Sequence, residues 1–189
     1  GCIDAKTVWV FQDIGCDVAE STLRSRIEML VGNRDPVAGE YSGVTLPAMY
    51  DLIATKVRTG GAVVVLGYPQ LVEEVARWDG WRRDFSPNCE GVQSDDVAML
   101  RSAAGYLNQQ IALAVQAADK RWSGKGVRFI WRDIATGVYE KGDAVDQRHG
   151  LCGQNPWING ITTGWRSGDA QHERSFHPKQ EGHTATGEW

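Results

Sequence analysis

Two histidines near the end of the sequence are the residues best suited to acid–base chemistry. The sequence there reads Ser175-Phe176-His177-Pro178 and then Gly182-His183. A proline directly after His177 favours a helix start, because proline is tolerated in the first helical turn. His177 would then lie in a loop between a strand and a helix, where α/β proteins place their sites. Imidazole exchanges protons near neutral pH, so His177 is a candidate general base; an ordinary surface histidine is the alternative.

The remaining candidate ligands have spacings that fit no metal site. His177 and His183 are six residues apart, not four as in a helical zinc site, and there is no Cys-x-x-Cys pair. Asp143 and Asp146 flank a turn and are most simply solvated, although a glycosidase carboxylate pair is conceivable. We therefore expect neither a metal nor a cofactor.

The four cysteines bear on the compartment. They are Cys2, Cys16, Cys89 and Cys152, and three pairings are open. Loop size favours the local pair Cys2–Cys16, which leaves Cys89–Cys152. In the chain-entropy model, disulfides that close loops of these sizes would stabilise the fold by about 3 and about 4 kcal/mol, respectively. Disulfides persist in oxidising compartments, so we expect a secreted protein; four free thiols in a cytosolic protein are the alternative. No signal peptide is visible before Gly1, so either one was removed or the sequence starts partway through a longer protein.

Helices and strands alternate along the chain. Apolar spacing predicts helices over Asp17–Leu30, from Thr45 (with Pro47 in the first turn) to Val57, from Ser94 or Asp95 to Trp122, and from Pro178. Apolar runs predict strands at Ala62–Leu66 and Val127–Trp131, the first buried on both faces. Irregular stretches are expected at Val31–Gly43, Trp78–Val92 and Asp133–Ser175. The order predicts an α/β protein with a parallel sheet, yet two strands are fewer than a doubly wound sheet needs.

Composition excludes several functions. The chain has 189 residues, one domain's worth, with 20 Lys+Arg against 24 Asp+Glu and a net charge of −4. Without a basic cluster it is a poor nucleic-acid binder. Its longest apolar run, Ala62–Leu66, is far too short to span a membrane.

Several stretches, in order, resemble the SGNH (GDSL-type) ester hydrolases, most of all the secreted actinobacterial esterase/lipase branch. The block Ser175-Phe176-His177-Pro178 with Gly182-His183 is similar to that family's last block. Further likenesses cover nearly the whole chain: Gly1-Cys2-Ile3 with Cys16, Leu66-Gly67-Tyr68-Pro69, Leu107-Asn108, Val127–Trp131, Gly150-Leu151-Cys152, and Pro156-Trp157-Ile158-Asn159-Gly160. The resemblance implies a three-layer, flavodoxin-like α/β fold, of which residues 1–189 form the C-terminal part of a single domain.

The resemblance also assigns roles to residues. His177 would be the general base of a Ser-His dyad or triad that hydrolyses carboxylic esters. The substrate would be a small-molecule or lipid ester, and the enzyme a monomer. Most relatives place an aspartate three residues before this histidine, where this chain has Arg174. The Arg174 carbonyl would orient the imidazole instead; the side chain of Glu173 is the second choice.

The family's nucleophile and oxyanion blocks are absent from this sequence. It contains no Gly-Asp-Ser and no Gly-x-Ser-x-Gly, and Val31-Gly32-Asn33-Arg34-Asp35 is only superficially like Gly-Gly-Asn-Asp. Oxyanion donors contribute about 10²–10³ in rate each, so the isolated chain is expected to be inactive, with its N-terminal strands missing. The alternative is a complete, non-catalytic secreted module that binds through its tryptophan-bearing loops. Whichever function holds, the functional role considered for Trp157 or Trp165 is to line an acyl or sugar pocket; packing of the loops is the simpler role for the tryptophans.

Overall fold

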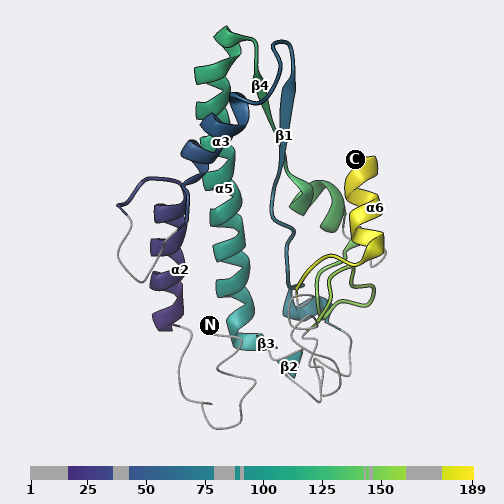
Figure 1. Cartoon of the computed structure of the whole chain (residues 1–189). Helices are drawn as coiled ribbons and strands as arrows, with labels where there is room; N and C mark the ends of the chain where they lie inside the picture. The colour runs from purple at the N-terminus through teal and green to yellow at the C-terminus, as the bar shows by residue number, and fades with distance from the viewer. Residues whose placement is uncertain are drawn as a thin grey trace, which may run out of the picture. The chain divides into compact units, whose positions relative to one another are not determined.

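The chain forms a mixed α/β protein with a small parallel sheet (Figure 1). The computed structural model describes residues 17–35, 43–78, 88–89, 92–142, 144, 147–160 and 176–189. These fall into two compact units. We call Asp17–Tyr68 with Gly105–Asp133 the helix–sheet unit, and the described parts of Pro69–Ala104 and Ile134–Trp189 the disulfide unit.

The helix–sheet unit contains the parallel sheet. Its elements are α2 (Asp17–Leu30), α3 (Leu46–Ala54), most of α5 (Val97–Trp122), a 3₁₀ turn (Ser123–Lys125), β1 (Ala62–Leu66) and β4 (Arg128–Arg132). Strands β1 and β4 pair in parallel, with Val64 opposite Ile130. The predicted bounds of α2 and β1 are confirmed, whereas β4 lies one residue later than expected. Helix α3 has Pro47 in its first turn but ends at Ala54, before Val57. A 3₁₀ turn, Ser94–Asp96, precedes α5 and takes in the expected capping residues.

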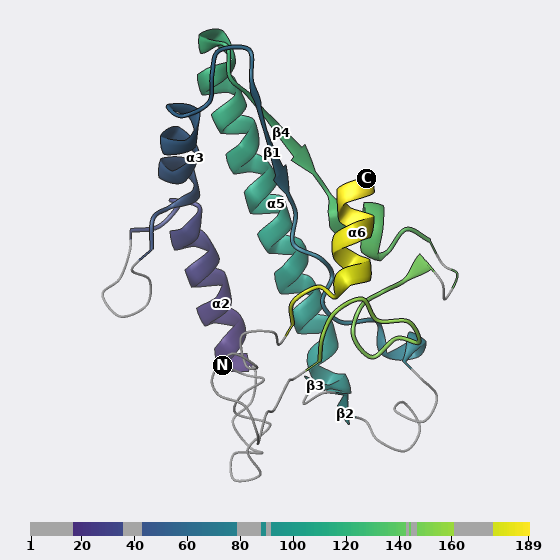
Figure 2. The same ribbon diagram turned by 45° about the vertical axis from the view of Figure 1, so that its right-hand side comes forward.

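One face of the β1–β4 sheet is covered and the other is open. Val63 and Val65 pack on a core made of side chains from α3, α5, β4 and the residue before β4: Tyr50, Ala54, Ile111, Val115, Ala118, Val127 and Phe129. Both views show α3 and α5 on the same side of the two strands (Figures 1 and 2). On the opposite face, Val64 is 56% exposed and Leu66 is 45% exposed. The expectation that β1 is buried on both faces is therefore wrong, because among the described residues the helices cover only one face.

The disulfide unit is made of short elements. They are two 3₁₀ turns (Val75–Arg77 and Ser94–Asp96), an antiparallel pair β2 (Asn88–Cys89) and β3 (Val92–Gln93), a π-helix (Ala135–Tyr139) and α6 (Gln180–Glu188). The stretches expected to be irregular thus contain β2 and the π-helix. Helix α6 begins at Gln180 rather than Pro178, because Pro178 forms a β-bridge with Ile158 and Lys179 is the extended N-cap. In the described part of the chain, no helix is both long and apolar enough to cross a lipid bilayer.

Candidate active site

The backbone around His177 is held between Asn159 and the start of α6. The His177 carbonyl accepts hydrogen bonds from the Asn159 main-chain amide at 2.9 Å and from its side-chain Nδ2 at 3.1 Å. The Phe176 amide donates back to the Asn159 carbonyl at 3.1 Å. Two residues later, the Lys179 amide donates to the Trp157 carbonyl at 2.6 Å. His177 is therefore fixed through its main chain, while its side chain is exposed.

Phe176 has a backbone conformation that phenylalanine rarely adopts. Its φ is 62°, in the left-handed region, and its side chain packs against the core of the disulfide unit. Such a residue costs about 1–3 kcal/mol and is found where the surrounding contacts enforce it, often at functional sites. Here the contacts that enforce it are the hydrogen bonds to Asn159 and the packing of the partly buried ring against the core. The strained residue therefore directly precedes His177, the candidate general base.

The other residues assigned to the catalytic centre are not placed. Arg174 and Glu173 lie outside the described residues, as do Cys2 and Cys16. Within the described residues, the imidazole of His177 makes no hydrogen bond, and no group of three His, Cys, Asp or Glu side chains could hold a metal ion. The orienting role of the Arg174 carbonyl therefore stays a prediction.

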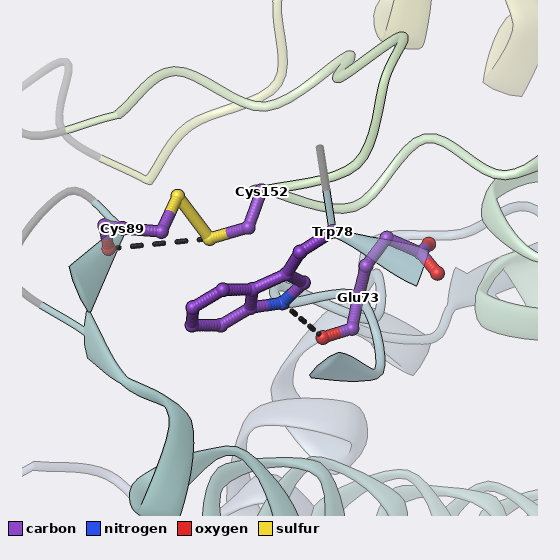
Figure 3. The surroundings of a disulfide bond; sticks show 4 residues. All are labelled: Glu73, Trp78, Cys89 and Cys152. Atoms are coloured by element: carbon purple, nitrogen blue, oxygen red, sulfur yellow. Dashed lines mark hydrogen bonds between the residues drawn. A yellow bond between two sulfur atoms is a disulfide. The ribbon is translucent and has the colours of Figure 1, made fainter. Parts of the chain in front are cut away.

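Cys89 and Cys152 lie at disulfide distance, as the sequence predicts. Their Cα atoms are 5.7 Å apart and 63 residues separate them. Both cysteines are buried, and Trp78 lies next to them, its indole Nε1 donating to the Glu73 carbonyl at 2.9 Å (Figure 3). The bond joins the β2 strand to the loop after the π-helix. It thereby ties together the two separate stretches of sequence that make up this unit.

A buried carboxyl group, that of Glu73, lies in the surroundings of this disulfide (Figure 3). The Glu73 side chain is 1% exposed, and its Oε1 accepts a hydrogen bond from the Gly150 amide at 3.2 Å. Its Oε2 has no hydrogen-bond partner among the described residues. Arg148 is 3.8 Å from Oε2. Burial raises the pKa of Glu73, the Glu140 charge raises it further, and the Gly150 amide and Arg148 oppose the shift. No motif or spacing in the sequence singles out Glu73.

Trp157 lines a cavity, in line with one of the two roles considered for it. Its indole stacks on the His149 ring, with centroids 3.3 Å apart and planes 3° from parallel, and meets Tyr139 edge-on. His149 is buried, and its Nδ1 lies 3.1 Å from the Asn155 carbonyl. Because a carbonyl only accepts, Nδ1 carries the proton. The spacing of residues in the sequence predicts no role for His149. Trp165, the other tryptophan considered for a pocket, lies outside the described residues.

Comparison with known proteins adds no relative. No protein-family model, no curated protein and no solved structure matches the chain.

Proposed function

We propose that this chain carries the general base of a carboxylic ester hydrolase of the SGNH type, and that His177 is that base. The supporting observation is the loop around His177. Its main chain is fixed by Asn159 and preceded by the left-handed Phe176, while the imidazole remains exposed. A base needs this combination, since it must keep its position and still reach a reacting group.

In the proposed reaction, His177 takes the proton from a serine hydroxyl as that oxygen attacks the ester carbonyl carbon. The C–O bond to the alcohol then breaks, and the imidazolium returns its proton to the departing alcohol. In the second half of the reaction, His177 takes a proton from water as the water oxygen attacks the acyl-enzyme carbonyl carbon. The C–O bond to the serine then breaks, the imidazolium returns its proton to the serine oxygen, and the carboxylic acid is released. The serine and the oxyanion donors would come from residues outside the 189, because their motifs do not occur in this sequence.

The imidazolium formed in this reaction needs an acceptor for its second N–H. We assign this role to the Arg174 carbonyl, and secondarily to the Glu173 carboxylate. Both precede the strained Phe176 by two or three residues, so the chain can bring either back toward the ring. Neither metal nor cofactor is required by this reaction.

The open sheet supports the larger three-layer fold that the proposal requires. Strand β1 pairs with β4 along one edge, and next to it is an apolar groove of about 480 Å³ lined by β1, by Leu30 of α2 and by side chains of α3 and α5. Among the described residues, the other edge of β1 has no partner strand, and Val64 and Leu66 are exposed, so this edge is a template for another strand. We propose that further strands of the same protein pair there, and that the complete enzyme is a secreted monomer acting on small-molecule or lipid esters.

The test begins with the coding DNA upstream of Gly1. If it encodes a Gly-Asp-Ser block, the full-length protein should hydrolyse p-nitrophenyl acetate, and His177→Ala should abolish turnover. His183→Ala is the matched control, because His183 is also an exposed histidine and lies on α6. Equal activity in the His177→Ala protein would rule out the assignment.

A binding module is the second candidate, favoured by the cavity at Trp157. In this case residues 1–189 form a complete secreted protein, and β1 needs no further strand. The chain alone should then unfold in one cooperative thermal transition. A fragment of a larger enzyme should instead bind hydrophobic dyes and aggregate, because β1 and the apolar groove are left uncovered.

A further inference from the structure

A cavity of about 370 Å³ opens between the π-helix, α6 and the loop that carries Trp157. This volume lies within the range of about 300–1,000 Å³ for small-molecule sites. Aromatic and polar residues share the lining: His149, Trp157, Trp189, Lys141, Gln147 and Glu188. The cavity belongs entirely to the disulfide unit, and His177 does not line it.

Both tryptophans of the lining are packed against other residues of the disulfide unit. Trp157 is fixed by the stacked His149 ring and by its own main-chain amide, which donates to the His149 carbonyl at 2.9 Å. Trp189 lies so close to Gly137 of the π-helix that a methyl group on that glycine would overlap the indole. Trp189 is nevertheless half exposed. An indole that is supported on one side and open on the other can receive the flat face of a ligand.

The polar part of the lining carries both charge signs. Lys141 and Glu188 are exposed, and neither forms a salt bridge with another described residue. Gln147 adds a side-chain amide, which can both donate and accept hydrogen bonds. A strongly charged ligand would meet one like charge in this cavity. A neutral ligand with several hydroxyl groups would find donors and acceptors at its edge and indole surface for its apolar face.

We infer that this cavity binds a neutral carbohydrate whose pyranose ring has equatorial hydroxyls, with the ring stacked on Trp189 beside Trp157. Such a ring presents C–H groups on its faces and hydroxyls around its rim, which matches the division of the lining. The site is independent of the ester-hydrolase proposal, because none of its lining residues has a part in that reaction.

The eight tryptophans allow the site to be tested by NMR of the full 189-residue chain. Indole N–H signals are followed while cellobiose, xylobiose or N,N′-diacetylchitobiose is added to tens of millimolar. We expect at least one of the three to shift the Trp157 and Trp189 signals with a millimolar dissociation constant. Sorbitol, which has hydroxyls but no rigid face, should leave both signals in place.

Variants locate the binding. Trp189→Ala and Gly137→Ala should each weaken it about tenfold, the first by removing the indole and the second by displacing it. Gly187→Ala on α6 is the matched control, because a methyl group there meets no atom within 4 Å. His177→Ala should also bind normally, which separates this site from the ester-hydrolase proposal. If none of the three disaccharides shifts either signal, or if binding survives Trp189→Ala unchanged, the inference is overturned.

Discussion

Asn159 holds the main-chain carbonyl of His177 with two donors, its own amide at 2.9 Å and its side-chain Nδ2 at 3.1 Å. A single residue thereby fixes the backbone of the proposed base from a loop 18 positions earlier. Both hydrogen bonds end on the main chain of His177 and leave its imidazole untouched. They therefore position the histidine without restricting the rotation of its ring.

Removing the Asn159 side chain should loosen His177 and leave the fold intact. Asn159→Ala retains the main-chain bond and loses the Nδ2 bond, which is a cost of about 0.5–1.5 kcal/mol. Hydrogen exchange at the Phe176 amide should be correspondingly faster. Asn155→Ala is the control, because among the described residues Asn155 contributes its main-chain carbonyl to a hydrogen bond and its exposed side chain contributes none. Equal exchange in both variants would contradict a positioning role.

The Cys89–Cys152 bond should be the strongest single stabiliser of the disulfide unit. Closing a loop of 63 residues contributes about 4 kcal/mol in the chain-entropy model, so Cys152→Ala should lower Tm markedly in the non-reduced protein. Intact mass before and after alkylation reports whether the bond has formed. A Tm that is the same with and without reductant would show that the two cysteines are not bonded.

Glu73 should make stability depend on pH. Burial raises the pKa of Glu73, so the folded protein binds this proton more tightly than the unfolded chain does. The contribution of protonated Glu73 to the free energy of unfolding is therefore complete at acid pH. It is lost as the pH rises through the pKa that Glu73 has in the folded protein. The Tm advantage of Glu73→Gln over the parent protein should therefore grow as pH rises. Glu74→Gln, at a half-exposed neighbour, should show no such growth; a Glu73→Gln deficit that widens with pH would contradict the assignment.

Two glycines of α6 should respond oppositely to alanine. A methyl group at Gly182 would lie 2.5 Å from the buried Tyr139 hydroxyl and 3.1 Å from the Trp157 carbonyl. Gly182→Ala should therefore destabilise by about 1–3 kcal/mol through overpacking. Gly187→Ala meets open space and should stabilise by up to about 1 kcal/mol through helix propensity. Thermal unfolding of the two variants measures both, and a stabilised Gly182→Ala would show that α6 does not pack there.

Val64→Lys distinguishes an open sheet from a covered one. Val64 is 56% exposed, so in the 189-residue chain a lysine should cost little stability and should reduce aggregation. In a longer protein that covers this face, the same lysine would be buried and should lower the free energy of unfolding by several kcal/mol. Unfolding curves of the two proteins provide the comparison. Large destabilisation of the short chain would mean that this face is already covered.

Sequence patterns predicted the regular elements well where the pattern itself determines the structure. Helix α2 and strand β1 have the predicted bounds, because helical spacing and a β-branched run are local properties. The exposure of Val64 could not be predicted in this way. A run such as Ala62–Leu66 looks the same whether one face or both are covered, since coverage depends on distant segments.

The candidate site was only partly predictable for a related reason. His177 stood out by its type and by the proline that follows it. The Asn159 contact and the burial of Glu73 depend on which loops meet in space, and no spacing in the sequence encodes that. The π-helix at Ala135–Tyr139 has no periodic signature either.

The disulfide also affects how the protein responds to proteases. Residues 89–152 form a covalent ring that contains β4 and all of α5. A cut within the ring, for instance after Lys125 in the turn before β4, opens the backbone without releasing a fragment. Such a nicked protein would migrate as two pieces only after reduction. In an environment rich in proteases, the ring keeps the sheet strands and the His177 loop on one molecule after the chain has been cut.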